Sequence, residues 1–251
     1  MTIRAIETLQ SVAFIWCEDT RVTKVLLDHY GIHTPMVSYH DHTTQAQMEA
    51  LLEKAKGQAI ALVSDAGTPL LQDPGYELIQ YAIQHHIPIE SIPGASSILN
   101  ALVVSGVAPY PFTFAGFIPS KAAARRTFLQ QYVLLDHTLV MFETAKRIQA
   151  TLRELQSLNV QRNVVVAREM TKQFETIYRG SIEDLLAQTI IEKGEIVLVL
   201  GPLRQAVEDP MVMIQTLVDQ GMKPVDAVKT VAKWTQTPKH ELYEAYENRS
   251  R

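Results

Sequence analysis

A loop of small and polar residues is the first place in this chain where a ligand could bind. It follows an apolar run at residues 59–63, which predicts a buried strand, and consists of Ser64, Asp65, Ala66, Gly67, Thr68 and Pro69. Loops at the carboxyl ends of strands bind ligands in open α/β sheets. Gly67 lets a ligand approach the backbone closely, and Pro69 stiffens the loop. An ordinary strand-to-helix connection has a similar composition, so both interpretations stay open.

Two charged clusters also follow predicted strands and could bind a polar substrate. The first comes after residues 13–17 and consists of Glu18, Asp19, Thr20 and Arg21. Its Asp19 or Thr20 could equally cap the next helix. The second comes at the end of residues 163–168 and consists of Arg168, Glu169 and Lys172. Surface ion pairs on a hairpin explain this second cluster as well, and such pairs contribute little energy.

Five basic residues in the middle of the chain could meet an anionic partner, namely Lys121, Arg125, Arg126, Lys146 and Arg147. Lys121 and Arg125 are four residues apart, so they share one face of a predicted helix near its start. Positive charge is unfavourable at a helix N-terminus, and a phosphate partner would offset that cost. Residues 121–173 hold nine Lys or Arg and four Asp or Glu, in a chain of net charge −4. Charge alone favours the alternative, a solvated helix surface.

Several chemistries lack their usual sequence patterns. The chain has no Gly-x-Ser-x-Gly elbow, no Walker A loop and no Gly-x-Gly-x-x-Gly turn, which argues against nucleotide hydrolysis and dinucleotide redox chemistry. His40, Asp41 and His42 are metal-ligating residue types, but such close neighbours seldom converge on one ion without a distant ligand. No such ligand pattern is present, so we expect no metal.

The composition is typical of a globular protein in a reducing compartment. Its 251 residues are 47% hydrophobic and 20% charged, enough for a large core. The single cysteine, Cys17, excludes an intramolecular disulfide framework. No apolar run approaches the roughly 18 residues of a membrane helix, and the N-terminus lacks the order of a secretory signal. We therefore expect a cytoplasmic protein with no membrane partner.

Alternating helices and strands must position the residues named above. Before residue 92, the periodicity predicts helices at residues 3–10, 22–29, 43–56 and 75–85. It predicts strands at residues 13–17, 36–39, 60–64 and 88–91. This alternation favours an α/β fold with a parallel, doubly wound sheet.

The pattern is less regular after a predicted hinge at residues 92–94. Helices are expected at residues 95–105, 121–132, 145–155 and 182–188. Strands are expected at residues 112–116, 138–143, 163–168, 175–180 and 195–201. Some of these strands follow one another without a long helix, so antiparallel pairs are expected.

Three further helices are predicted at residues 212–220, 224–234 and 238–248. Such a short helical unit is a weak signal for nucleic acid. We therefore predict an α/β domain at residues 1–92, a second at 93–203 and a helical unit at 207–251.

Seven motifs occur in this chain in a fixed order. They are Glu18-Asp19-Thr20-Arg21, Ser64-Asp65-Ala66-Gly67-Thr68-Pro69, Asp73-Pro74-Gly75, Pro93-Gly94-Ala95-Ser96, Gly116-Phe117-Ile118-Pro119-Ser120-Lys121, Phe142-Glu143 and Arg168-Glu169-Met170-Thr171-Lys172. Together they resemble the ribosomal RNA small subunit methyltransferase I family of the tetrapyrrole methylase superfamily. The resemblance runs from about residue 3 to the C-terminus.

The resemblance implies a tetrapyrrole-methylase-like fold of two α/β domains, with S-adenosylmethionine bound between them. It implies 2′-O-methylation of a cytidine ribose in 16S rRNA, at the decoding centre of the 30S ribosomal subunit. Proteins of this family are cytoplasmic and often homodimeric, so we expect the same here. The chemistry is consistent, because aligning a reactive methyl donor with a ribose hydroxyl can supply much of a rate increase.

The resemblance also implies residue roles. The residues expected to bind the cofactor are Ser64, Asp65, Ala66, Gly67, Thr68, Pro69, Pro93, Gly94, Ala95, Ser96, Ser97, Phe142, Glu143, Gly201 and Pro202. The catalytic candidates, expected near the reacting ribose, are Glu18, Asp19, Arg21, Arg168, Glu169 and Lys172. The residues expected to contact RNA phosphates are Lys121, Arg125, Arg126, Lys146 and Arg147. Which group accepts the hydroxyl proton stays open.

One departure from the family pattern concerns the N-terminus. Members usually begin with a strand and a loop resembling Thr-Pro-Ile-Gly-Asn, and this chain opens on a helix instead. That loop would form one wall of the active site. Either the start was misassigned or the chain is truncated, and we expect the 251-residue chain by itself to be weakly active or inactive.

Two alternatives to ribosomal RNA methylation stay open. A superfamily member could methylate a tetrapyrrole or another small molecule, although such a substrate needs no extended basic face. A truncated chain could also bind RNA without catalysing any reaction. Binding of S-adenosylmethionine would distinguish an enzyme from this last possibility.

Overall fold

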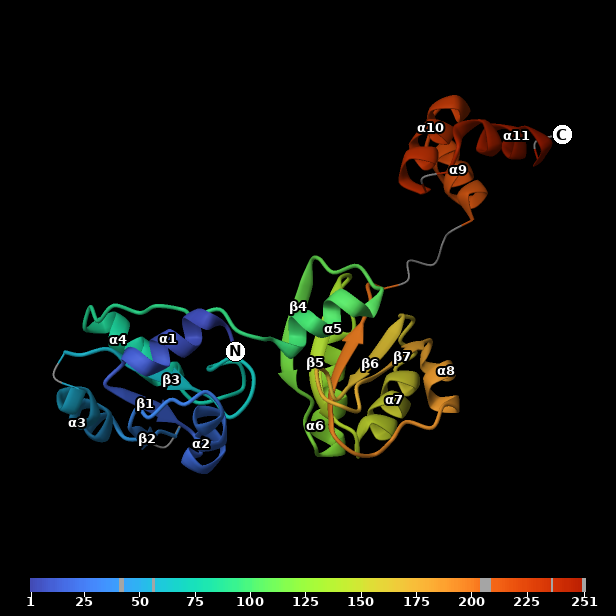
Figure 1. Cartoon of the computed structure of the whole chain (residues 1–251). Helices are drawn as coiled ribbons and strands as arrows, with labels where there is room; N and C mark the ends of the chain where they lie inside the picture. Colours follow the sequence, from blue (N-terminus) through green and yellow to red (C-terminus); the bar gives the residue numbers. More distant parts are fainter. Residues whose placement is uncertain (41–42, 56, 204–208, 236, 250–251) are drawn as a thin grey trace. The chain divides into compact units, whose positions relative to one another are not determined.

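The computed structural model describes residues 1–40, 43–55, 57–203, 209–235 and 237–249, without the side chains of Lys54 and Arg249. The chain divides into two compact units, Met1–Pro202 and Leu203–Arg251 (Figure 1). The first unit contains two separate sheets, and the second is helical. The further division of the first unit at residue 92 stays a prediction.

The first sheet is parallel, with strand order β2-β1-β3. Its strands are β1 (Phe14–Cys17), β2 (Met36–Ser38) and β3 (Ile60–Val63). The connecting helices are α1 (Ile3–Ser11), α2 (Thr20–His29), α3 (Gln45–Ala55) and α4 (Tyr76–Gln84). Trp16 of β1 is buried and stacks on Tyr39, with 5.6 Å between the ring centroids. The βαβ alternation read from the sequence is therefore confirmed for these elements.

The strand predicted at residues 88–91 is wrong. This segment forms no strand in the structure, and β3 is an edge strand of its sheet. Ile87 and Ile89 are 38% and 48% exposed, respectively. An apolar alternation becomes a strand only where a neighbouring strand supplies hydrogen bonds, and no described strand pairs with this segment.

The second sheet is mixed, with strand order β4-β5-β8-β6-β7. Its strands are β4 (Phe112–Phe117), β5 (Thr138–Thr144), β6 (Val164–Arg168), β7 (Thr176–Gly180) and β8 (Glu195–Leu200). β4 and β5 are parallel, whereas β8 runs antiparallel to both β5 and β6, and β7 runs antiparallel to β6. The expected α/β class and the antiparallel pairs are thus confirmed.

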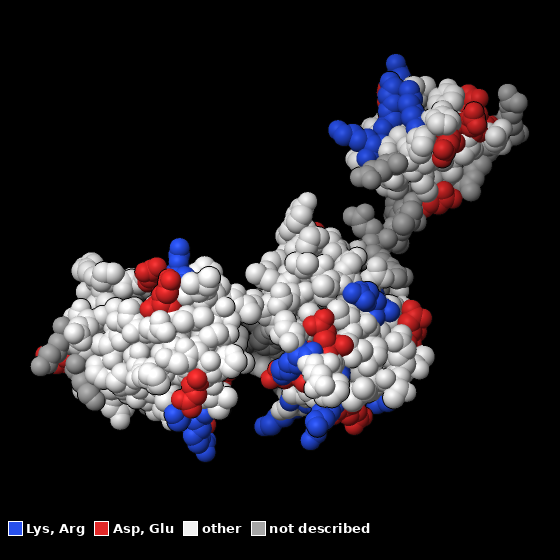
Figure 2. Space-filling view, viewed as in Figure 1, with Lys and Arg blue, Asp and Glu red and all other residues white. Residues whose placement is uncertain are grey.

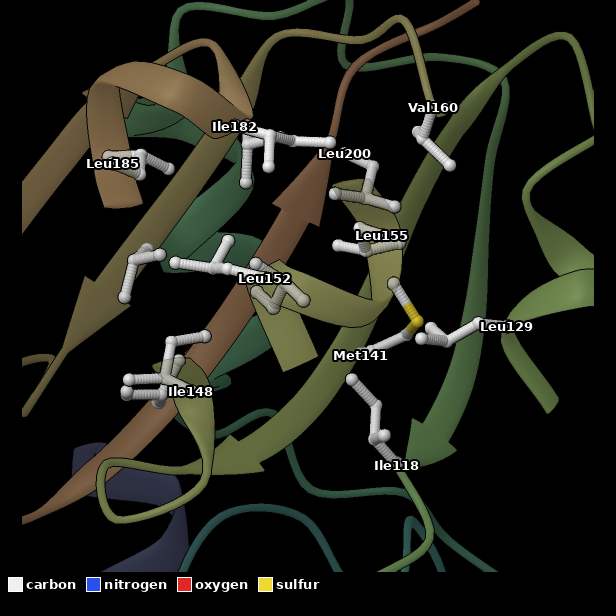
Figure 3. Packing of buried hydrophobic residues seen from close by; sticks show 14 of the residues in the cluster. Ile118, Leu129, Met141, Ile148, Leu152, Leu155, Val160, Ile182, Leu185 and Leu200 are labelled. Atoms are coloured by element: carbon white, nitrogen blue, oxygen red, sulfur yellow. The ribbon is translucent and has the colours of Figure 1, made fainter. Parts of the chain in front are cut away.

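Helices cover both faces of this second sheet. They are α5 (Ser97–Ser105), α6 (Ala122–Tyr132), α7 (Ile148–Ser157) and α8 (Ile182–Ala187). On one face, Ile148, Leu152 and Leu155 of α7 lie against the sheet near Met141 and Leu200 (Figure 3). On the other face, α5 packs through Ile98, Ala101 and Leu102. This double coverage explains why β5, β6 and β8 read as continuous apolar runs.

The second unit contains α9 (Pro210–Asp219), α10 (Pro224–Thr235) and α11 (Lys239–Arg249). These helices confirm the three predicted ones, although the predicted start of the unit at residue 207 lies outside the described residues. Its own core is formed by Met211, Ile214, Ala227, Val228, Val231 and Leu242. Among the described residues of the whole chain, no helix is both long and apolar enough to cross a membrane.

Candidate active site

The two loops that follow β1 and β3 meet at the carboxyl edge of the first sheet. From the central strand β1 the chain passes to β2 on one side, and from β2 it crosses to β3 on the other side of β1. Such a reversal of direction in a parallel sheet opens a ligand-binding crevice beyond the strand ends. Here the backbone N–H of Asp19 donates a hydrogen bond to Oδ1 of Asp65, at 3.2 Å. The predicted Glu18–Arg21 cluster and the predicted Ser64–Pro69 loop are therefore neighbours.

Asp19 has a structural role as well as a possible functional one. Its carboxylate accepts a hydrogen bond from the Arg21 backbone N–H at 2.8 Å and so caps α2, as predicted. The Arg21 guanidinium also donates to it, with Nη2 2.6 Å from Oδ2. These bonds lower the pKa of Asp19 to about 2. The carboxylate is therefore ionised at neutral pH and is a weak base.

The loop after β3 presents its backbone to solvent and is held in a strained conformation. Residues 65–68 are exposed. Leu70 and Gln72 have φ angles of 72° and 74°, which non-glycine residues rarely adopt. Gly75 has a φ of 132°, and a Cβ there would lie 2.6 Å from the Leu62 side chain. Strain of this kind persists only where surrounding contacts impose it, and it concentrates at functional loops.

Gln72 connects this loop to the carboxyl end of β4. Its Oε1 accepts a hydrogen bond from the Phe117 backbone N–H at 3.4 Å. Gly116, at an irregularity of β4, has a φ of 77°, and a Cβ there would lie 2.9 Å from Gln72 Nε2. Sequence reasoning assigned no role to Gln72. Gln72 lies between the Ser64–Pro69 and Asp73–Gly75 motifs, but its contact with β4 depends on the tertiary structure.

The N-terminus of α5 lies beside an aromatic group of the second sheet. Ser96 caps the helix by accepting a hydrogen bond from the Leu99 backbone N–H at 3.5 Å. The preceding Pro93, Gly94 and Ala95 are exposed. Helix α5 packs on a cluster that includes the partly buried Phe142 and Met170. Uncapped N–H groups beside an apolar surface suit a ligand with one anionic end and one apolar end.

Phe142 is the centre of this aromatic group. Its ring lies 4.9 Å from that of Phe114 and 5.1 Å from that of Phe117, measured between centroids. Met170 packs against the same cluster and was missed as a site residue. The signal was available, because Met170 lies inside the predicted Arg168–Lys172 motif.

The side chain of Glu143 is fully engaged inside the protein. It is 1% exposed, and its Oε2 accepts a hydrogen bond from Thr151 Oγ1 at 2.6 Å. Its Oε1 accepts hydrogen bonds from Arg147 Nε at 2.8 Å and from the Thr144 backbone N–H at 2.7 Å. This carboxylate is therefore held inside the protein, and the cofactor contact of Glu143 stays a prediction that concerns its backbone. Successive strand residues face opposite sides, which separates Glu143 from Phe142.

The second charged cluster forms a network at the carboxyl end of β6, which is at the same edge of the second sheet as Phe142 of β5. Arg168 is 4% exposed and donates hydrogen bonds to the carbonyls of Lys193 and Phe174, at 2.6 and 3.0 Å. Glu169 accepts from Lys172 Nζ at 3.1 Å and from the Glu195 backbone N–H at 3.0 Å. Arg168 thus positions two loops, while Glu169 and Lys172 lie nearer the surface.

These contacts determine the charge of Glu169 and Lys172. The Glu195 N–H and then Lys172 lower the pKa of Glu169 below its ordinary value. Hydrogen bonds from Lys172 to Glu195 and Glu169 raise the pKa of Lys172. Both groups are therefore charged at neutral pH, and neither is tuned to take up a proton there.

The five basic residues predicted to contact phosphates differ in what they can do. Arg125 is 9% exposed and donates a hydrogen bond to the Ser120 carbonyl at 3.3 Å. This burial contradicts the RNA contact expected of Arg125. Arg126 pairs with Glu154 at 2.7 Å, and Arg147 pairs with Glu143 at 2.6 Å. Lys121 and Lys146 are exposed, and neither forms an ion pair within the described part of the chain. These two lysines are the available cations of the set.

Gly201 and Pro202 lie away from the residues they were expected to join. β5 and β8 are antiparallel, with Leu139 opposite Leu200 and Thr144 opposite Glu195. The carboxyl end of β8 is therefore at the opposite edge of the sheet from Glu143. Gly201 also donates its N–H to the Asn163 carbonyl and accepts a hydrogen bond from buried Arg162, both at 2.8 Å. The expectation that Gly201 and Pro202 complete one pocket with Glu143 is thus corrected.

The predicted histidine cluster is described in part. His40 contacts Ser38 at 2.8 Å, next to the Glu18 carbonyl, while Asp41 and His42 lie outside the described residues. Within the described ranges, no group of three or more His, Cys, Asp or Glu could hold a metal ion.

Comparison with known proteins identifies the family. Residues 1–186 match the Tetrapyrrole (Corrin/Porphyrin) Methylases. A Streptococcus pyogenes protein named "Ribosomal RNA small subunit methyltransferase I" is 37% identical over 98% of this chain and 89% of its own length. A Synechocystis protein of the same name is 39% identical over 97% of this chain and 91% of its own. This chain belongs to the tetrapyrrole methylase family, and within it to the ribosomal RNA small subunit methyltransferase I family. The family resemblance and the prediction of a methyltransferase are confirmed.

Two solved structures share the fold of this chain. A diphthine synthase superimposes with a TM-score of 0.63 at 13% identity, covering 80% of this chain and 84% of that one. Uroporphyrin III C-methyl transferase from Thermus thermophilus gives 0.54 at 17% identity, covering 80% and 90%. At such low identity these matches establish the tetrapyrrole methylase fold alone. The roles predicted for the site residues of this methyltransferase are therefore argued from its own geometry.

Proposed function

We propose that this chain transfers a methyl group from S-adenosylmethionine to the 2′-hydroxyl of a cytidine ribose in 16S rRNA. The observation that carries the proposal is its identity of 37–39% to proteins named ribosomal RNA small subunit methyltransferase I, over 97–98% of its length. The 30S subunit is the proposed partner, and the cytoplasm, where ribosomal subunits lie, is the proposed location. A homodimer stays a prediction.

The residues around α5 and the loop after β3 fit a donor of this kind. S-adenosylmethionine, when bound, supplies a methyl group on a positively charged sulfur. Added Cβ atoms at Gly67 and Gly94 would meet nothing within 4 Å, so their backbones are open to a ligand. The first turn of α5 can bind the carboxylate of the donor through backbone N–H groups. Phe142 and Met170 offer an apolar surface to its uncharged part.

We assign Asp19, Arg21, Glu169 and Lys172 to binding and orienting the ribose rather than to proton transfer. Asp19 and Glu169 have lowered pKa values and Lys172 a raised one, so all three are charged near pH 7. An effective general base has a pKa near the working pH, which none of these groups has. Alignment of the hydroxyl with the donor carbon is therefore the main contribution proposed for the protein.

Methyl transfer to 30S subunits from cells lacking this gene tests the proposal. Labelled S-adenosylmethionine should deliver label to 16S rRNA, and nuclease digestion with mass spectrometry should recover 2′-O-methylcytidine. Label in a porphyrin precursor, with none in rRNA, would support the small-molecule alternative. Failure to bind S-adenosylmethionine in calorimetry would support the non-catalytic RNA binder.

A matched pair of variants tests the proposed donor site. Phe142→Ala should weaken S-adenosylmethionine binding about tenfold, because it removes an aromatic surface from the ligand. Leu134→Ala is the control, because Leu134 is 78% exposed, belongs to none of the predicted site motifs and precedes the amino end of β5, whereas Phe142 lies near its carboxyl end. Equal affinities for both variants and the wild type would remove Phe142 from the site.

A further inference from the structure

The second unit, Leu203–Arg251, has its charges separated between two sides. Lys223, Lys229 and Lys233 belong to α10 or directly precede it, and α10 contains one carboxylate, Asp226. Glu241, Glu244 and Glu247 all belong to α11. Figure 2 shows basic side chains gathered on one side of this unit and acidic ones on the other. The α10 side is therefore positive in a unit that also carries a negative side.

The lysines of α10 are available to a partner. Lys229 pairs with Asp226 at 3.4 Å, but both side chains are 56% exposed, so this pair contributes little energy. Lys223 and Lys233 are exposed and form no ion pair within the described part of the unit. On α10, Lys229 and Lys233 are four residues apart and share one face.

Lys223 occupies a position where the fold alone does not favour a cation. Its carbonyl accepts hydrogen bonds from the N–H groups of Asp226 and Ala227, so it lies at the N-terminus of α10. Ser, Thr, Asp and Asn are the usual residues at such a position, and positive charge there opposes the helix dipole. An external anion would offset this cost.

The last turn of α10, which contains Lys233, also carries an exposed tryptophan. Trp234 follows Lys233 in the last turn of α10 and is 59% exposed, whereas the other tryptophan, Trp16, is 1% exposed. Trp234 therefore adds little to the core of its unit, which consists of smaller apolar side chains. Flat aromatic rings beside lysines are the two components with which proteins bind unpaired nucleotides, by stacking and by phosphate contact.

We propose that the α10 surface, defined as Lys223, Lys229, Lys233 and Trp234, binds an unpaired RNA segment. The lysines contact phosphates, and Trp234 stacks on a base. This proposal rests on the proposed function, because it names the second RNA contact of a chain that acts on ribosomal RNA. An acidic protein is the alternative partner for the lysines, but it gives no reason for an exposed tryptophan beside them.

The surface gives the chain a contact with RNA that does not depend on the reacting ribose. The unit has its own core, so its contribution is to affinity and placement rather than to the methyl-transfer step. Loss of the α10 surface should raise KM for the RNA substrate and leave kcat nearly unchanged.

Full-length variants test the proposal through RNA affinity and its salt dependence. The double variant Lys229→Ala and Lys233→Ala should reduce the slope of log K against log salt by about 1.4, since each contact with single-stranded phosphate contributes about 0.7. The control is Arg4→Ala with Lys24→Ala, which removes two exposed cations from the first unit. That control should keep the wild-type slope.

Trp234 gives an independent optical signal. An unpaired 16S rRNA oligonucleotide should quench the fluorescence of the exposed Trp234, while the buried Trp16 responds little. Trp234→Ala should weaken RNA binding about tenfold, and Trp234→Phe should restore most of the affinity because phenylalanine also stacks. Circular dichroism of each variant establishes that it folds.

The outcomes separate this proposal from the proposed function. An unchanged salt slope in the double variant, or unchanged affinity in Trp234→Ala, would overturn the α10 surface whether or not the chain methylates rRNA. Quenching by an acidic polypeptide, with none by RNA, would also overturn it. Weakened RNA binding with unaltered S-adenosylmethionine affinity would support it even if no methyl transfer is found.

Discussion

At the scale of single residues, burial separates the charged groups that hold the fold from those that a substrate can reach. Glu143 and Arg168 belong to motifs that suggest chemistry, yet each is almost fully buried and hydrogen-bonded within the protein. A buried charge without partners is very costly, so such groups must be satisfied internally. Asp19 and Lys172 carry the same kinds of charge at accessible positions. Similar motifs therefore contain both positioning residues and residues suited to binding.

Glu143 gives a stability prediction. Glu143→Gln leaves Arg147 without its carboxylate and Thr151 with an altered partner, and it should lower the free energy of unfolding by about 2 kcal/mol or more. This loss of stability should be smaller than for a fully buried ion pair, because Arg147 is 30% exposed. Urea unfolding provides the measurement. Glu154→Gln, which breaks the more exposed pair with Arg126, is the control and should cost at most about 1 kcal/mol.

Asp19 and Glu169 give a prediction about pH. Arg21 holds the pKa of Asp19 at about 2, and the Glu195 N–H with Lys172 lowers that of Glu169. A lowered folded-state pKa stabilises the protein above the unfolded-state pKa, and this stability is lost as pH falls through the folded value. Because both pKa values lie below the ordinary carboxyl range, neither carboxylate titrates between pH 6 and pH 9.

The measurement is the pH dependence of methyl transfer. Asp19→Asn and Glu169→Gln should lower kcat/KM by about tenfold through weaker ribose binding, and the shape of the profile should stay that of the wild type. If either variant lost an ionisation near neutral pH, that carboxylate would be the general base, and the assignment made here would fail.

At the scale of elements, the loop after β3 depends on its contact with β4. Gly116 allows this contact, because its φ of 77° is unfavourable for other residues and its missing Cβ leaves room for Gln72. The contact aligns this loop, which is proposed to bind the methyl donor, with a strand of the second sheet. Loop and strand are thus coupled through one glycine and one glutamine.

Gly116→Ala should reduce both stability and donor binding. The backbone strain should cost about 1–2 kcal/mol in urea unfolding, and displacement of Gln72 should weaken S-adenosylmethionine binding in calorimetry. Adding Gln72→Ala removes the clash while leaving the strain, so the double variant should be more stable than Gly116→Ala alone. Identical stabilities would mean that the steric contact contributes nothing.

At the scale of the whole molecule, the two compact units have separate cores. The second unit packs α9, α10 and α11 around Ile214, which is 0% exposed. Its hydrophobic residues make a cluster distinct from those of the two sheets. Each unit is therefore expected to unfold as its own cooperative transition.

Ile214→Ala tests this independence. The cavity should destabilise the second unit by about 2–5 kcal/mol, and calorimetry should show its transition moving to lower temperature. S-adenosylmethionine binding by the first unit should be unaffected. Val212→Ala, at a position that is 53% exposed, is the control and should change stability by about 0.5 kcal/mol or less. A single transition that shifts as a whole would contradict two independent units.

The sequence by itself determined most of the helices and strands, the α/β class and the family. These depend on local information: apolar periodicity, caps such as Asp19 and Ser96, and motifs read in order along the chain. The apolar runs that precede them also placed the Glu18–Arg21 and Ser64–Pro69 loops at strand ends. Neighbouring parallel strands carry their carboxyl ends to one edge, so their meeting at Asp19 and Asp65 was accessible to sequence reasoning.

The tertiary structure decided which residues share an edge and which charges are exposed. Residues 88–91 read as a strand but lack a paired neighbour, and the antiparallel direction of β8 carries Gly201 away from Glu143. Arg125 and Glu143 have side chains suited to ligands but are enclosed by the fold. Pairing, direction and burial arise from contacts between segments distant in the chain, and local residue patterns do not encode them.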